Sequence, residues 1–163
     1  QVAGSSPAKG VQFQNRRNNM GMDCMGDNPS CKQGEYFRAN IWSWCPIHHL
    51  ICHFCDQHVE VFGTTLIDDE TLSHMSVNDG EGPSDEKTCE ILADYFETYI
   101  EREMEGDVTE CKYGPRCCSE TNAFLSEEEA EKSTKTYWAY RVERSHLEEF
   151  VGFLRSCGGF RVY

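Results

Sequence analysis

The chain lacks any long uninterrupted hydrophobic run, and it is poor in positive charge. Its longest apolar stretches, around 47–54 and 150–154, are broken by His, Cys or Gly, whereas a membrane-spanning helix needs roughly 18 or more apolar residues. Lys and Arg number 15 against 28 Asp and Glu, which gives a formal net charge of −13. Because phosphate backbones repel such a surface, the sequence argues against direct nucleic-acid binding as well as against a membrane protein.

Familiar catalytic signatures are also missing. The sequence contains no phosphate-binding loop, no Gly-x-Ser-x-Gly nucleophile elbow and no His-Glu-x-x-His motif. With ten cysteines and six histidines, Cys–His nucleophilic chemistry stays open, but no feature of the sequence selects a pair. An enzyme is therefore the less favoured class of function.

Cysteine, by contrast, is abundant, with ten residues in a chain of 163. In a secreted protein an even number would suggest disulfides, and secretion with disulfides is the alternative that stays open. Against it, the chain is long enough to bury a core without cross-links. Several cysteines also fall on apolar helix positions, where Cys packs as a small hydrophobe. We therefore expect reduced thiols and a cytoplasmic location.

Apolar periodicity and capping residues predict an α+β fold in a single domain over residues 20–163. We expect about three helices: one over 46–62 opening at Pro46, one capped by Ser84, and one opened by the capping box of Ser145 and Glu148. They should pack on a small mixed sheet formed by three strands, 21–25, 136–142 and 160–163. The last two strands and the helix between them predict a C-terminal β-α-β unit.

Two further segments have a distinctive composition. Residues 1–19 carry Gly, Ser, Gln and Asn with almost no apolar periodicity, which predicts disorder. The string at 2–8 also reads like an in-frame translation of the T-arm of a transfer-RNA gene, so we expect a mis-called extension and a true start at Met20 or Met22. Residues 63–83 and 106–125 are expected to be loops, and Ser126 with Glu129 predicts the start of a short acidic helix.

Five short motifs together resemble a family of small uncharacterised proteins of bacteriophages and bacteria. They span most of residues 20–163: Met-Gly-Met-Asp at 20–23, Gly-Glu-Tyr-Phe-Arg-Ala-Asn at 34–40, Trp-x-Trp-x-Pro at 42–46, Asn-Asp-Gly-Glu-Gly at 78–82 and Phe-Leu-Arg-x-x-Gly-Gly-Phe at 153–160. That family has no assigned activity, and some members are zinc-ribbon-like in their middle. The resemblance implies a phage-type accessory protein in the cytoplasm of a bacterial host cell.

The chain departs from this pattern at two places. Cys111 is followed by Cys117 and Cys118 without a Cys-x-x-Cys pair, so a complete zinc ribbon is not expected. Cys45 stands where the family usually carries Arg between the second Trp and the Pro. Any role that the family gives this arginine is therefore absent here.

A zinc site is one hypothesis for the helix over 46–62. His48, Cys52 and Cys55 are spaced i, i+4 and i+7, which places them on one stripe beside the core face. Imidazole and thiolate suit Zn(II), and tetrahedral closure needs a fourth ligand, for which we take Cys117 among the cysteines of the irregular segment, Cys111, Cys117 and Cys118. The alternative is that the stripe uses Cys and His for packing.

The pair Cys52 and Cys55 also has the Cys-x-x-Cys spacing of dithiol oxidoreductases. Those motifs sit at a helix N-terminus, where the helix dipole lowers the thiol pKa. Here the pair falls in the middle of a predicted helix, which weakens the redox interpretation.

A ligand pocket is the second hypothesis, and it is built on aromatic side chains. Trp42 and Trp44 point the same way if their segment is extended. They then either anchor the core or form the aromatic wall of a pocket, with polar side chains around it. The candidate ligand-binding residues are Arg38, Asn40, Trp42, Trp44, Asn78 and Asp79. Residues 78–82 lack the spaced carboxylates of a calcium loop, so we expect a turn there.

These observations predict a non-enzymatic accessory protein that acts by binding an unidentified protein partner and could carry one structural Zn(II). Two alternatives stay open. An acidic inhibitor of a basic host defence factor requires the carboxylates of 85–107 and 127–131 to form one continuous face. A Cys-dependent redox or metal enzyme requires a solvent-exposed Cys52 with a perturbed thiol.

Overall fold

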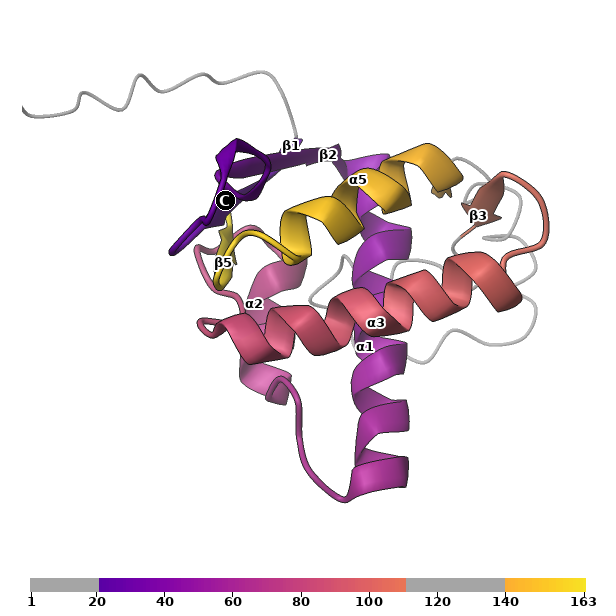
Figure 1. The fold of residues 1–163 in the computed structure, drawn as a ribbon, viewed down its shortest axis with the longest axis horizontal. Coiled ribbons are helices and arrows are strands. Elements are labelled where there is room, and N and C mark those ends of the chain that lie inside the picture. Colours follow the sequence, from indigo (N-terminus) through magenta and orange to yellow (C-terminus); the bar gives the residue numbers. More distant parts are fainter. Residues whose placement is uncertain (1–20, 111–139) are drawn as a thin grey trace, which may run out of the picture.

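The computed structural model describes residues 21–110 and 140–163, and it confirms the α+β class (Figure 1). The elements in chain order are β1 (Gly21–Gly26), the short 3-10 helix η1 (Lys32–Gly34), β2 (Tyr36–Asn40), α1 (Ile41–Phe62), α2 (Asp69–Ser76), α3 (Glu86–Arg102), β3 (Val108–Glu110), β4 (Arg141–Glu143), α5 (Arg144–Leu154) and β5 (Phe160–Val162). Among the described helices, none combines the length and apolar character needed to span a bilayer.

The main sheet has three antiparallel strands in the order β2-β1-β5. Cys24 lies opposite both Phe37 and Val162, and all three side chains are buried. Strands β1 and β5 were predicted, but the sheet is antiparallel rather than mixed, and its third strand is β2. No strand was predicted over residues 36–40. The alternation in β2 covers five residues whose outer positions are polar, so its strand signal is short.

Strand β4 belongs to a separate two-stranded sheet with β3. The expected β-α-β unit is therefore a strand–helix–strand segment whose two strands lie in different sheets. Of the predicted strand over 136–142, residues 136–139 lie outside the described residues. Arg144 fixes this two-stranded sheet to the end of α3, because its guanidinium donates to the carbonyl oxygens of Ile100 at 2.8 Å and Gly106 at 3.0 Å.

The core is formed where α3 and α5 pack in front of α1 (Figure 1). Phe150 of α5 lies at its centre, with ring contacts to Phe37, Trp44, Phe96 and Phe160. Edge-to-face geometry dominates these contacts, which is the favourable arrangement for aromatic quadrupoles. The core thus joins the sheet to all three long helices.

Helix α1 begins at Ile41, five residues before the predicted start at Pro46. Asn40 is its N-cap, and its side chain accepts the Ser43 N–H at 2.9 Å. Pro46 lies inside the helix, where its ring cannot donate to the carbonyl of Trp42. Because helical residues two apart are about 200° apart around the axis, the two tryptophans point to different sides rather than the same side.

The remaining differences concern helix starts. Helix α2, capped by Asp68, lies in the segment 63–83 that we expected to be a loop. Asp85, not Ser84, caps α3 by accepting the Thr88 N–H at 2.8 Å. Helix α5 follows β4 directly with Glu143 at the N-cap position, so Ser145 lies inside the first turn and the predicted capping box does not form. The predicted acidic helix after Ser126 lies outside the described residues.

Candidate functional site

An open hollow of about 620 Å³ lies where the first turns of α1 and α5 meet strand β4. We call it the α1–α5 hollow. Its lining residues are Asn40, Trp42, Ser43, Arg141, Val142, Glu143, Ser145, His146 and Glu149. The first four backbone N–H groups of any helix lack partners within that helix, and two helices begin at this hollow. At these two starts the Ser43 N–H is bonded to the Asn40 side chain and the Arg144 N–H to the Asp107 carbonyl, so the polar character of the site comes from its lining side chains, which carry both charges.

Trp42 supplies the aromatic surface of the hollow. Its side chain is 47% exposed, and its ring centroid lies 4.9 Å from that of Tyr140. The neighbouring Asn40 is engaged as the N-cap of α1, which fixes the backbone before Trp42. The aromatic surface of Trp42 is therefore presented by the capped start of a helix rather than by an unsupported loop.

His146 also lines the hollow and is held by two contacts. Its ring centroid lies 4.8 Å from that of Phe37, and its Nδ1 lies 3.2 Å from Oε2 of Glu149. These contacts orient the imidazole on the first turn of α5. Together with Arg141 and Glu143, the site can hydrogen-bond polar groups while an apolar group lies against Trp42.

Only two of the six predicted ligand-binding residues, Asn40 and Trp42, line this hollow. Trp44 is a core residue, 1% exposed, whose indole N–H donates to the Met75 carbonyl at 3.0 Å. Its place in the core follows from the helical conformation that we had not expected before Pro46.

The other three predicted residues lie elsewhere. On β2, the Nε of Arg38 lies 3.7 Å from the Asp23 carboxylate, which also accepts the Tyr36 hydroxyl. Burial and the hydrogen bond to Asp23 raise the pKa of Tyr36 to about 12. Asp79 pairs with His74, with 2.7 Å between Oδ2 and Nδ1.

Asn78 adopts a left-handed conformation with φ 49°, in a turn that runs along β5. The Gly80 N–H donates to the Val162 carbonyl at 2.8 Å, and the Val162 N–H donates to the Glu81 carbonyl at 3.1 Å. The segment 78–82 is therefore a turn that covers the edge of the main sheet.

The residues on the α5 side of the hollow were missed from the sequence: Arg141, Glu143, Ser145, His146 and Glu149. The signal was weak because only the tertiary packing of β4 against α1, and of α5 against β2 and β4, brings these positions to Asn40 and Trp42.

The three proposed metal ligands on α1 are largely withdrawn from solvent, since His48 and Cys55 are buried and Cys52 is partly buried. His48 is 4% exposed, and its Nε2 lies 2.8 Å from the Leu72 carbonyl oxygen. The Cys52 sulfur lies 3.9 Å from both ring nitrogens of His48. Burial raises the pKa of Cys52 to about 12 and that of Cys55 to about 11. Both thiols are therefore protonated near neutral pH, and Cys52 lacks the activated thiolate that a redox enzyme needs.

Within 21–110 and 140–163, no group of three or more His, Cys, Asp or Glu side chains is arranged to hold a metal ion. His48, Cys52 and Cys55 thus do not form a metal centre by themselves. The fourth expected ligand, Cys117, lies outside the described residues. The Zn(II) hypothesis depends on that cysteine and stays a prediction.

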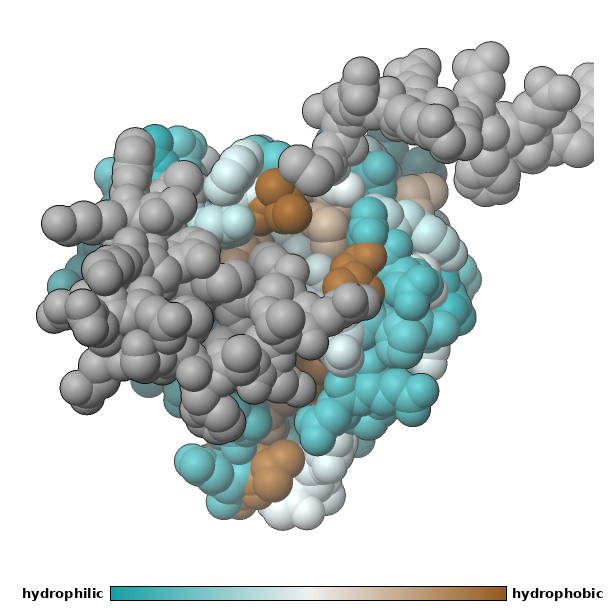
Figure 2. Space-filling model, turned by 180° about the vertical axis from the view of Figure 1, so that it is seen from behind, coloured by the Kyte–Doolittle hydropathy of each residue, from teal (hydrophilic) through white to brown (hydrophobic). Residues whose placement is uncertain are grey.

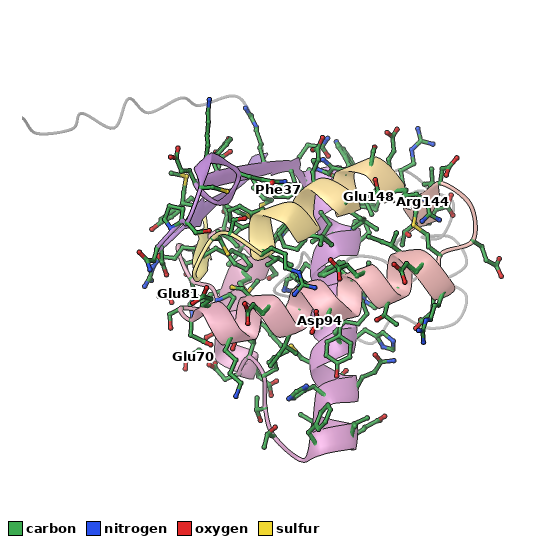
Figure 3. All side chains as sticks on the ribbon, viewed as in Figure 1. Phe37, Glu70, Glu81, Asp94, Arg144 and Glu148 are labelled. Carbon is green, nitrogen blue, oxygen red and sulfur yellow. The ribbon has the colours of Figure 1, made fainter. Side chains whose placement is uncertain are left out.

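The outer face of α3 carries a stripe of carboxylates: Glu90, Asp94, Glu97 and Glu101, all exposed. Figure 3 shows Asp94 on this face, with Glu148 and Arg144 on the neighbouring α5. Arg155 crosses from the end of α5 and places Nη2 2.5 Å from Asp94 and 2.7 Å from Glu97. Residues 127–131, the other half of the expected acidic face, lie outside the described residues.

No family model, curated protein or solved structure matches this chain. The resemblance to the phage family therefore rests on the sequence motifs alone. In the structure, Phe153 and Phe160 of the last motif are core residues, and Gly158 and Gly159 adopt positive φ angles. The fold and the hollow define an α+β protein with an open site of mixed polar and aromatic character.

Proposed function

We propose that this chain is a non-enzymatic accessory protein of phage type that binds a polypeptide partner through the α1–α5 hollow. The observation that carries the proposal is the half-exposed Trp42 at the hollow. Tryptophan and arginine are the residue types enriched where binding energy concentrates, and Trp42 and Arg141 both line this site.

The size and lining of the hollow suit a short stretch of a protein chain. A volume of about 620 Å³ is within the range of ligand sites, roughly 300–1,000 Å³. The polar lining offers donors and acceptors for main-chain groups, and Trp42 offers a flat surface for an apolar or aromatic side chain. Viewed from behind, hydrophobic residues appear only as separate patches among hydrophilic ones on the visible described surface (Figure 2).

The test is selection from a random displayed peptide library against the whole chain. Enriched peptides should bind the unaltered protein, and their affinity for the Trp42→Ala variant should be at least about tenfold lower. A loss of this size is modest for a residue at a binding hot spot. Phe62→Ala is the matched control, because it removes an aromatic side chain that is 63% exposed at the other end of α1. Peptides that bind Trp42→Ala as tightly as the unaltered chain would refute the proposal.

A second candidate function is binding to a basic partner, including inhibition of a basic host factor, and the carboxylate stripe on α3 favours it. Like charges on one exposed helix face attract a cationic surface and speed its encounter. Glu90→Gln with Glu101→Gln should weaken binding to a lysine-rich peptide at low salt. Glu60→Gln with Glu70→Gln removes two exposed carboxylates from α1 and α2 and is the matched control. If both double variants lose the same affinity for the peptide, net charge alone explains the binding. That result would refute a specific binding surface on α3.

A further inference from the structure

The two outer strands of the main sheet differ in what lies along their free edges. The turn over 78–82 lies along β5, where the Val162 N–H donates to the Glu81 carbonyl at 3.1 Å. On the other side of the sheet, β2 pairs with β1, and no further strand within 21–110 and 140–163 pairs with it. We call the side of β2 that faces away from β1 the β2 edge.

The strand register identifies the backbone groups that point outward from the β2 edge. The Gly26 N–H of β1 donates to the Glu35 carbonyl at 3.1 Å, just before β2 begins. In an antiparallel pair every second residue bonds to the partner strand, so Phe37, like Glu35, directs its backbone groups to β1. The N–H and C=O groups of Tyr36 and Arg38 therefore point away from β1.

These outward groups lie at the protein surface. Tyr36 and Arg38 are both exposed, whereas Phe37 between them is buried. Within the part of the chain that the structure describes, the backbone hydrogen bonds of turns, loops and caps do not use the N–H or C=O of Tyr36 or Arg38. Such groups on an outer strand are a template for pairing with another extended chain.

The β2 edge leads directly into the α1–α5 hollow. Asn40 is the last residue of β2, caps α1 and lines the hollow, and Trp42 follows in the first turn of α1. Four residue steps separate Tyr36 from Asn40, which is roughly 13 Å of extended chain. A chain that lies against Trp42 and continues along β2 would therefore meet the outward groups of Arg38 and then those of Tyr36.

We propose that the polypeptide partner binds as an extended segment, which adds a fourth strand to the main sheet at the β2 edge and ends in the hollow. This inference rests on the proposed binding function and specifies the conformation of the partner. An extended main chain presents donors and acceptors at the spacing of a strand, and this matches the outward groups of Tyr36 and Arg38. Main-chain pairing of this kind supplies affinity, and side-chain contacts supply specificity.

The charges at the β2 edge specify the occupant further. Arg38 is the only cation of β2, and its Nε lies 3.7 Å from the Asp23 carboxylate of β1. Because a guanidinium has five N–H donors, it can bind a second carboxylate. Opposite charges directly across two strands stabilise their pairing, so the segment should carry Asp or Glu across from Arg38. A second copy of this chain is disfavoured, since two copies of net charge −13 repel each other.

The experiment measures amide hydrogen exchange in the whole chain by NMR, with and without the peptides selected from the displayed library. In the free protein the N–H groups of Tyr36 and Arg38 should exchange rapidly, whereas that of Phe37 is already bonded to β1. At saturating peptide, exchange at Tyr36 and Arg38 should slow by at least about tenfold, and Phe37 is the internal control. Unchanged exchange at Tyr36 and Arg38 in the complex would overturn strand addition.

A scan of the peptide itself gives an independent test that needs no protein variant. N-methylation removes one N–H donor at a time, and in an added strand only every second residue directs its N–H to β2. Affinity should therefore fall at least about tenfold at alternate positions and change little between them. Losses at every third or fourth position would indicate a bound helix and overturn the proposal. Arg38→Gln should weaken the binding of acidic peptides, and equal affinity would refute the pairing with Arg38.

The outcomes separate this inference from the proposed function. Peptides that need Trp42 but leave exchange at Arg38 unchanged would refute strand addition and leave binding at the hollow standing. Peptides that slow exchange at Arg38 but bind Trp42→Ala as tightly would refute the hollow, and with it the continuous site. Exchange at Arg38 that slows with protein concentration alone would show that a second copy occupies the β2 edge, which would overturn the proposal. If no peptide is enriched, both proposals fail.

Discussion

The α1–α5 hollow and the end of the main sheet differ in how tightly they are packed. We call this end, formed by residues 156–162 and the segments that touch them, the corner around β5. At the hollow, two helix starts meet with Trp42 left 47% exposed. At the corner, Cys157 and Phe160 are 0% exposed, and backbone segments touch directly. The difference indicates that the corner maintains the fold, whereas the hollow leaves about half of Trp42 in contact with solvent.

The motifs behind the family resemblance fall largely on the corner. A Cβ added at Gly82 would lie 2.2 Å from the Phe160 carbonyl oxygen, and one added at Gly34 would lie 2.0 Å from the Ser156 carbonyl oxygen. These glycines permit close approach of the backbone, which no other residue allows. Much of this motif pattern therefore reflects how the corner is packed, and the resemblance alone says little about binding.

The largest expected effect is at the centre of the corner. Phe160→Ala should lower the free energy of unfolding by about 3–5 kcal/mol, because it empties a fully buried aromatic site. Urea unfolding followed by circular dichroism measures this. Val61→Ala, at a side chain that is 70% exposed, should change stability by less than about 0.5 kcal/mol. Similar losses in the two variants would contradict the contrast between packed and open regions.

Gly82→Ala should cost about 2–3 kcal/mol, since the added methyl group clashes with the Phe160 carbonyl and forces the backbone apart. Gly106→Ala is the matched control, because Gly106 has a φ of 80° but open space around its Cβ position. It should cost only about 1 kcal/mol, from the backbone conformation alone. Thermal unfolding of the two variants side by side tests whether contact or conformation dominates at the corner.

A smaller effect is expected at the helix caps. Asp85→Ala removes the side chain that accepts the Thr88 N–H and should cost about 1 kcal/mol. Glu143→Ala should cost less, because the Glu143 side chain makes no capping hydrogen bond at the start of α5. Chemical denaturation measures the free energy of unfolding of both variants. A larger loss for Glu143→Ala than for Asp85→Ala would show that Glu143 stabilises the hollow more than its contacts indicate.

The smallest change in stability is expected at the hollow itself. Trp42→Ala should lower the free energy of unfolding by less than about 1 kcal/mol, because half of the side chain is already in water. The same variant should lose binding to the selected peptides. A loss of stability comparable to that of Phe160→Ala would mean that Trp42 is a structural residue, and the binding proposal would lose its main support.

Local patterns allowed the fold class and part of the core to be predicted. The apolar stripe of α3, including Cys89, Leu92 and Phe96, is buried as its spacing indicated. The start of α1 was wrong because Pro46 was taken as the first residue of the helix, although the Asn40 cap already fixes an earlier start. The hollow could not be predicted, because His146 and Trp42 are about a hundred positions apart and meet only through packing around Phe150.

The turn over 78–82 has one more consequence, which concerns self-association. An uncovered outer strand exposes hydrogen-bonding groups that can recruit a strand from another molecule and start aggregation. Gly80 and Glu81 already pair with Val162, so the rim of the sheet beside β5 is sealed from within the chain. The segment between α2 and α3 therefore connects two helices and also covers a sheet edge at which another molecule could add a strand.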